Sequence, residues 1–182
     1  VDSVAQLLKS PVKMMQWPEV DYMGVPHISV PTTAGTGAEV TNGAVIYNKG
    51  LGIKHLIVSH YLESDIAVLD AHMTTGLPPM LTAATGMDAL THAIETMGHP
   101  NTGHFTLAHA ETSAKIIMQN LPKVVADGSD LLARQAMLNA SAMACNSVVN
   151  DFGPSPVHNF AHAFGAVCHI HHGEANGVLL PI

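Results

Sequence analysis

Hydrophobic and polar residues follow two different patterns along the chain, and the pattern changes near residue 70. Before this point, short apolar runs are separated by turn residues, which is typical of strands. Strands are predicted at 27–30, 44–47, 56–58 and 66–69, and short helical patterns lie at 4–8 and 61–63. A mixture of strands and helical patterns indicates an α/β fold for this part.

After residue 70 the pattern is helical throughout. Helices are predicted at 80–97, 106–121, 130–149, 157–167 and 174–180. Pro78 and Pro79 can open the first helix, since proline is tolerated in a first turn. Pro122 is expected to end the second helix, and Asp130 to cap the third. The sequence therefore predicts an α/β part followed by an all-helical part, with the boundary near residues 71–77.

Composition narrows the classes of partner. The net charge is -7, and no Lys/Arg cluster is present to bind phosphates, which argues against a nucleic-acid partner. No apolar run reaches the roughly 18–20 residues of a membrane span, so no membrane association is expected. Only Cys145 and Cys168 are present, which favours a reducing, cytoplasmic location over a disulfide-bonded one.

The two ends of the sequence lack the polar character usual for chain termini. Val1 is not an initiating Met, residues 2–8 look like the inside of a helix, and the chain stops on an apolar stretch at 179–182. The first ten residues show no signal-peptide pattern. We therefore expect the natural protein to be longer than this chain.

Histidine is unusually frequent, with 13 residues, five of them between His158 and His172. Asp88 and His92 are four residues apart in a predicted helix, so both side chains share one face. His158 and His162 repeat this spacing. One carboxylate and several imidazoles suit a divalent metal such as Fe²⁺ or Zn²⁺.

A simpler interpretation competes with the metal site. A single Asp/His pair at this spacing is more often a surface hydrogen bond than a ligand pair. Here, however, both polar pairs lie in helices otherwise rich in Ala, Leu, Val, Ile and Phe, where charged groups are costly unless paired or coordinated. From the residues alone the two interpretations are about equally supported.

Residues 31–41, Pro-Thr-Thr-Ala-Gly-Thr-Gly-Ala-Glu-Val-Thr, follow a predicted strand. Small residues allow a ligand to approach the backbone, and the hydroxyls offer hydrogen bonds. The segment is either a cofactor loop or a turn into a helix. It matches neither the Rossmann fingerprint nor a P-loop.

Together, these segments resemble the iron-containing (group III) alcohol dehydrogenase family over essentially the whole chain. Residues 31–41 are similar to its nucleotide-side signature, and residues 86–95 to its first metal signature. The second metal signature is matched by His158, His162, His172-Gly173 and Ala175-Asn176. The chain departs from the family at Ala163, where many relatives have proline, and around Pro154, where the approach to His158 is about one residue longer.

The resemblance implies a dehydroquinate-synthase-like architecture, incomplete in both parts. Residues 1–71 would be the C-terminal portion of the α/β dinucleotide-binding domain, and residues 72–182 the N-terminal portion of the helical metal-binding domain. The family's glycine-rich phosphate loop would lie just before Val1. The implied metal ligands are Asp88, His92, His158 and His172. The implied contacts to NAD or NADP are Thr32, Thr33, Thr36, Gly37 and Lys54.

The activity that the resemblance implies is hydride transfer between a small alcohol or aldehyde (or ketone) and NAD(P), with Fe²⁺ or Zn²⁺ as a Lewis acid on the substrate oxygen. His162 would lie near the nicotinamide and relay protons, and the full protein would be a homo-oligomer. His169 and His171 are expected to be exposed loop residues. One alternative is a dinucleotide- and zinc-dependent lyase of the dehydroquinate synthase type, which the scarcity of Lys and Arg opposes. The other is a non-catalytic metal-binding helical module, which leaves residues 31–41 unexplained.

Overall fold

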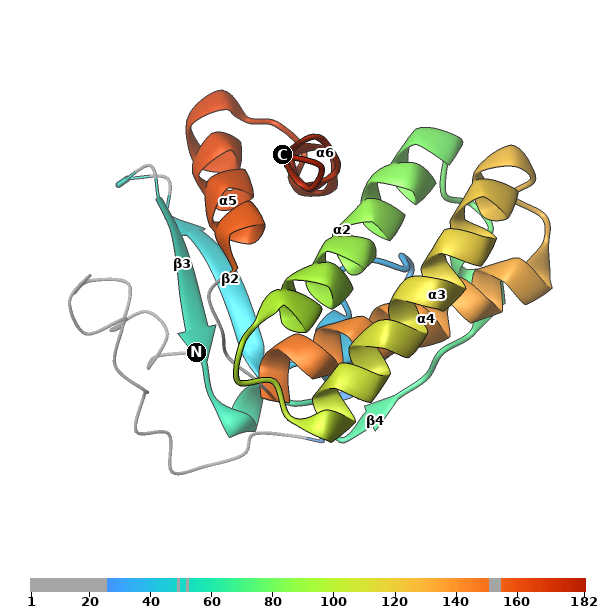
Figure 1. Ribbon diagram of the computed structural model, residues 1–182, viewed down its shortest axis with the longest axis horizontal. Coiled ribbons are helices and arrows are strands. Elements are labelled where there is room, and N and C mark those ends of the chain that lie inside the picture. The colour runs from blue at the N-terminus through green and yellow to red at the C-terminus, as the bar shows by residue number, and fades with distance from the viewer. Residues whose placement is uncertain (1–25, 49, 52, 151–154) are drawn as a thin grey trace.

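A computed structural model describes residues 26–48, 50–51, 53–150 and 155–182 of the chain. The predicted helical pattern at 4–8 lies outside the described residues. The strands come first along the chain and the helices follow, which confirms the predicted order of an α/β part and a helical part (Figure 1). No helix in these ranges is long and apolar enough to cross a membrane.

The strands form two separate pairs. β1 (Ile28–Ser29) and β4 (Ile66–Ala67) are parallel, with Ile28 opposite Ile66. β2 (Gly43–Asn48) and β3 (Ile53–Val58) are antiparallel, with Gly43 opposite Val58. All four predicted strands are present. The predicted helical pattern at 61–63 is a single 3-10 turn, η3 (His60–Leu62). The described ranges contain two more such turns, η2 (Ala38–Val40) and η4 (Ala71–Thr74).

The first two helices of the bundle are α2 (Pro79–Gly98) and α3 (His104–Ala126). The boundaries of α2 agree with the prediction, with Pro79 in its first turn. The prediction that Pro122 ends the second helix is wrong, because α3 continues for four residues beyond it. Leu121 and Val124 are buried on either side of the proline, and their packing outweighs the one hydrogen bond that proline removes.

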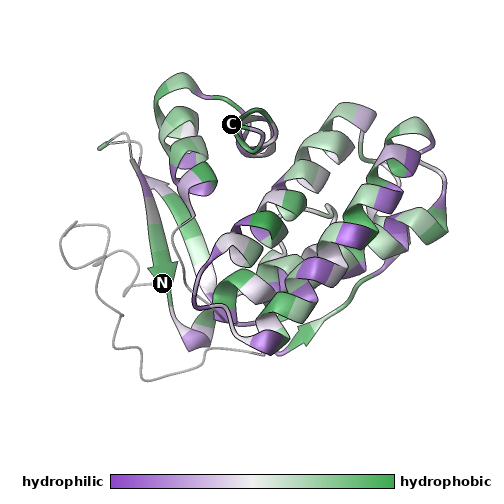
Figure 2. Ribbon diagram, viewed as in Figure 1, coloured by the Kyte–Doolittle hydropathy of each residue, from purple (hydrophilic) through white to green (hydrophobic). Residues whose placement is uncertain are grey.

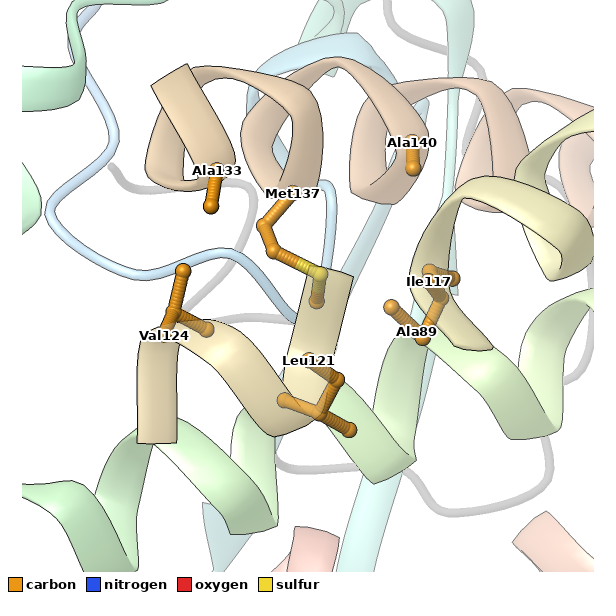
Figure 3. Packing of buried hydrophobic residues seen from close by; sticks show 7 residues of the cluster. All are labelled: Ala89, Ile117, Leu121, Val124, Ala133, Met137 and Ala140. Carbon is orange, nitrogen blue, oxygen red and sulfur yellow. The ribbon is translucent and has the colours of Figure 1, made fainter. Parts of the chain in front are cut away.

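α4 (Leu131–Asn150) completes the bundle. Asp130 caps it as predicted, since its carboxylate accepts a hydrogen bond of 3.0 Å from the Ala133 N–H. The largest cluster of buried apolar side chains joins α2, α3 and α4 (Figure 3). Its members are Ala89, Ile117, Leu121, Val124, Ala133, Met137 and Ala140.

The last two helices are α5 (Pro156–Cys168) and α6 (His172–Leu179). α6 begins two residues earlier than predicted, which places His172 in its first turn. Most of α5 is hydrophobic in Figure 2, yet Phe160 and Val167 are exposed. Figure 1 shows α5 beside β3 and α6 beside α2, and both pairs are in contact. The chain therefore brings its last two helices back to the first helix of the bundle.

Candidate metal centre

Three of the four predicted ligands converge from three different helices. Asp88 comes from α2, His158 from α5 and His172 from α6, and one ligand atom of each lies within 4.8 Å of the others. The Nε2 atoms of His158 and His172 each lie 3.4 Å from Oδ1 of Asp88. The side chain of Asp88 is only 3% exposed, so this carboxylate and its two imidazole neighbours are largely shielded from water.

The fourth predicted ligand, His92, lies beside this group but is not one of its members. Its ring stacks on that of His158, with centroids 4.3 Å apart and planes inclined by 14°. Its Nδ1 is buried and has no hydrogen-bond partner among the described residues. Asp88 and His92 do share one face of α2, as their spacing predicts. The ring of His92 nevertheless stacks against another imidazole instead of converging with the other three donors.

A glycine at the start of α6 allows His172 to reach this group. A Cβ atom on Gly173 would lie 2.1 Å from the carbonyl oxygen of Ala84, in the second turn of α2. Any side chain here would push the two helices apart. Gly173 therefore sets how closely the first turn of α6, and with it His172, approaches Asp88.

Glu95 connects α2 with the start of α5, a contact that the sequence did not predict. Its Oε1 accepts a hydrogen bond of 2.7 Å from the Val157 N–H, and its Oε2 contacts Nδ1 of His158. The side chain of Glu95 is 5% exposed. The spacing of Asp88, His92 and Glu95 at i, i+4 and i+7 was the available signal, because it places all three on one helix face.

Asn176 connects α6 with the same carboxylate. Its Nδ2 donates a hydrogen bond of 2.6 Å to Oδ1 of Asp88 and lies 3.3 Å from Nε2 of His172. Asn176 is fully buried. Its position four residues after His172, on the same face of α6, was the corresponding sequence signal. Asp88 is thus surrounded by side chains that stabilise its negative charge.

The charges of this group are strongly coupled. Burial opposes ionisation of Asp88, but the surrounding imidazoles outweigh it and hold the pKa of Asp88 well below its usual range. Burial likewise opposes a charge on His158, but Asp88 and Glu95 on either side of its ring raise its pKa to about 9. Burial lowers the pKa of His92 to about 4 and also lowers that of His172. The buried carboxylates of Asp88 and Glu95 therefore favour one positive charge in the space between them.

A divalent cation fits this arrangement. The group offers a carboxylate oxygen and imidazole nitrogens, the donors that Fe²⁺ and Zn²⁺ take in proteins. Nε2 of His158 is buried and has no hydrogen-bond partner among the described residues, although it lies close to Asp88. A cation at this point would satisfy the nitrogen and supply the positive charge that the two carboxylates favour.

His162 lies one turn after His158 on α5, next to the group but outside it. Its ring centroid is 4.6 Å from that of His172, and its Nδ1 is buried without a hydrogen-bond partner in the described part of the chain. Burial first, and then the positive charges of His172 and Lys54, lower the pKa of His162 to about 4. A neutral imidazole therefore lies at the edge of the site.

The predicted cofactor loop packs between α2 and α4. A Cβ atom on Gly35 would lie 2.7 Å from Cβ of Thr85, one turn before Asp88 on α2. Gly37 has a φ of 58°, and a Cβ atom there would lie 2.2 Å from Cβ of Cys145 on α4. Of the predicted cofactor contacts in this loop, Thr32 and Thr36 are exposed and Thr33 is half-buried.

Lys54 lies on β3, next to α5. Gly165 lies one turn after His162 on α5, and a Cβ atom on Gly165 would be 2.9 Å from Nζ of Lys54. His169 and His171 are exposed, as predicted. Cys145 and Cys168 are free thiols.

The chain matches two models of one protein family. The model of the "Fe-containing alcohol dehydrogenase family, C-terminal" matches residues 82–182, and that of "Iron-containing alcohol dehydrogenase" matches residues 4–71. Among curated proteins, the chain is 47% identical over 157 residues to the probable alcohol dehydrogenase EutG of Salmonella typhimurium, covering 86% of this chain and 40% of that protein. It is 41% identical to 1-propanol dehydrogenase PduQ of the same organism, covering 84% of this chain and 41% of that protein.

Solved structures show the same similarity in three dimensions. The crystal structure of a 1,3-propanediol oxidoreductase superposes with a TM-score of 0.84 at 40% identity, covering 89% of this chain and 42% of that one. Sulfoacetaldehyde reductase from Bifidobacterium kashiwanohense, in complex with NAD⁺, gives 0.80 at 36%, covering 85% and 41%. The chain thus spans about two fifths of the length of the relatives it matches.

Proposed function

This chain belongs to the iron-containing alcohol dehydrogenase family, and we propose that the protein containing it is a metal- and NAD(P)-dependent alcohol dehydrogenase. The enzyme would transfer hydride between a small alcohol and the nicotinamide. The observation that carries the proposal is the convergence of Asp88, His158 and His172 within 4.8 Å. The matched segment covers only 40% of the first of these relatives and 42% of the similar structure, so the activity is proposed for the protein as a whole.

The proposed metal ligands are Asp88, His92, His158 and His172. Asp88, His158 and His172 already face one another, and the ring of His92 stacks on that of His158 beside them. When bound, Fe²⁺ or Zn²⁺ would supply Lewis-acid polarisation of the substrate oxygen. The chain's own contribution is to hold these donors in a buried site from which water is largely excluded.

His162 is the proposed proton carrier. Its ring lies next to that of His172, and its depressed pKa keeps it neutral at physiological pH, so it can accept a proton. Lys54 lies on the same side of the site. We propose that Lys54 contacts the dinucleotide together with Thr32, Thr33, Thr36 and Gly37. The loop that contains the three threonines and Gly37 packs against Thr85 of α2, one turn from Asp88, which supports this placement.

Short alcohols and their aldehydes are the proposed substrates. The relatives include enzymes named for 1-propanol and 1,3-propanediol. NAD is favoured as the cofactor, since one relative is named NAD-dependent methanol dehydrogenase and one similar structure holds NAD⁺. We further propose that the α/β part ends at residue 71, that the full protein is a homo-oligomer, and that its two free thiols reside in the cytoplasm.

A pair of neighbouring histidines tests this proposal. His172 is proposed as a ligand, whereas His171 precedes it in an exposed position. His172→Ala should remove stoichiometric Fe²⁺ or Zn²⁺, measured by elemental analysis, together with alcohol oxidation measured as NADH formation. His171→Ala should retain most of the metal and activity. Equal metal content in the two variants would contradict the ligand set.

A further variant separates proton transfer from metal binding. His162→Ala should keep the metal, slow turnover and change the dependence of kcat on pH. Loss of metal in His162→Ala would instead make His162 a ligand. A protein that binds metal and NAD(H) but shows no alcohol oxidation would contradict the proposed reaction.

A further inference from the structure

Glu95 is a buried carboxylate whose two oxygens both contact the start of α5. Oε1 accepts from the Val157 N–H at 2.7 Å, and Oε2 contacts Nδ1 of His158. The side chain is 5% exposed, so these contacts largely replace water. A buried carboxylate is costly unless both oxygens find partners, and here α5 supplies both.

The backbone contact fixes where α5 begins. Ser155, the residue before the helix, makes no side-chain capping bond. Glu95 supplies that acceptor from α2, and its negative charge lies at the positive end of the helix dipole. The same carboxylate thus sets both the position of the helix start and the position of its third residue, His158.

The ring contact fixes which nitrogen of His158 can bind a ligand. An ionised carboxylate only accepts hydrogen bonds, so Nδ1 of His158 must carry the proton. A ring that carries only this proton directs the lone pair of Nε2 away from Glu95. That atom lies 3.4 Å from Oδ1 of Asp88 and is buried without a hydrogen-bond partner among the described residues.

We propose that Glu95 is a positioning residue for the metal site: it selects the Nδ1–H form of His158 and anchors the start of α5, so that Nε2 faces the cation. Glu95 does not touch the metal and acts through His158. The role rests on the proposed function, because it requires the cation between Asp88, His158 and His172. Carboxylates that orient a ligating histidine in this way typically change metal affinity by about 10- to 100-fold.

Two substitutions separate the two contacts. Glu95→Gln keeps the size of the side chain and one acceptor, which can still cap α5 at Val157, but its amide group would face Nδ1 as a donor. Glu95→Ala removes both contacts. Glu174→Gln is the matched control, because Glu174 is an exposed carboxylate only two residues from His172. It removes the same charge near the site without changing a contact to a ligand.

The test is a Zn²⁺ competition titration against a chromophoric chelator, on the protein in its natural length. Glu95→Gln should weaken Zn²⁺ binding by about 10- to 100-fold with little change in the thermal unfolding of the metal-free protein. Glu174→Gln should bind like the unmodified protein. Affinity of Glu95→Gln equal to that of Glu174→Gln would overturn the proposal, even if Glu95→Ala is too unstable to measure.

A double substitution shows whether Glu95 acts through His158. In a His158→Ala background, Glu95→Gln should cause no further loss of Zn²⁺ affinity. A loss as large as in the original background would overturn the proposal. In the Zn²⁺-loaded protein, the Nδ1 proton of His158 should give a low-field NMR signal that disappears in Glu95→Gln. An unmodified protein that binds no stoichiometric Zn²⁺ or Fe²⁺ would contradict the proposed function itself.

Discussion

Two parts of the molecule pack against α2 by different means. α3 and α4 contact it through apolar side chains, and the two hydrophobic clusters contain residues of these three helices but none of α5 or α6. α5 and α6 contact it through the polar side chains of the site, at Glu95, Asp88 and Asn176. Their buried apolar residues are only the small Ala161 and Ala175. Docking of α5 and α6 should therefore depend on the charge state and metal content of the site, whereas the bundle should not.

The largest effect is expected from substituting Asp88, because its carboxylate lies beside His158 of α5 and His172 of α6. Asp88→Asn preserves the shape of the side chain but removes the one anionic donor of the convergent group. Stoichiometric metal should be lost, as measured by elemental analysis. Asp127→Asn is the control, because Asp127 is exposed and bonds only within its own turn. Full metal content in Asp88→Asn would show that the carboxylate of Asp88 is not a required ligand.

The approach of α6 offers a second way to separate the two parts. Gly173→Ala should displace His172 from Asp88, because the new Cβ atom would meet the Ala84 carbonyl oxygen at 2.1 Å. Metal affinity should fall while the bundle remains folded. Gly177→Ala on the same helix should be tolerated, since its nearest contact would be an ordinary 3.4 Å to Met87. Equal Zn²⁺ affinity in the two variants would show that the close approach is not needed.

A substitution in the core of the bundle should lower the stability of the fold without weakening metal binding. Ile117 is completely buried in the main cluster, and Ile117→Ala should lower the free energy of unfolding by about 2–5 kcal/mol. Metal affinity below the unfolding temperature should be unchanged. Met118→Ala, next to it but 67% exposed, should have little effect on unfolding. A parallel loss of metal affinity in Ile117→Ala would show that the two parts are coupled through the bundle.

Chemical modification of the two cysteines probes the two parts of the molecule without any substitution. Cys145 is buried in α4, and burial, with the negative charges of Glu39 and Asp88, raises its pKa to about 12. Cys168 is exposed at the end of α5. At pH 8, a thiol reagent should modify Cys168 rapidly and Cys145 only when the bundle opens, because the thiolate is the reactive form. Rapid modification of both thiols, followed by mass spectrometry, would show that the bundle is not closed.

The sequence predicted the elements well because their signals are local. The cap at Asp130 and the proline at the start of α2 depend on neighbouring residues only, and the structure shows both. Pro122 was misjudged because burial of Leu121 and Val124, which depends on α4, outweighs a local rule. A pattern along one helix cannot show what the other helices will contribute.

The same limit applies to the site. The spacing of Asp88 and His92 placed both on one face of α2, but their side chains have different neighbours, and only Asp88 joins the convergent group. The roles of Glu95 and Asn176 became visible only with α5 and α6 in place, because each contacts a residue of another helix. The close approach of Gly37 to Cys145 likewise depends on another helix, α4.

Hydrogen exchange measured with and without metal tests most directly whether the site holds the last two helices. Backbone amides of α5 and α6 should exchange markedly faster after the metal is removed. The side chains that hold these helices against α2 would then no longer share a bound cation. Amides of α3 and α4 should be unchanged, because their packing is apolar. Unchanged exchange in α5 and α6, or an equal increase in all four helices, would contradict the account.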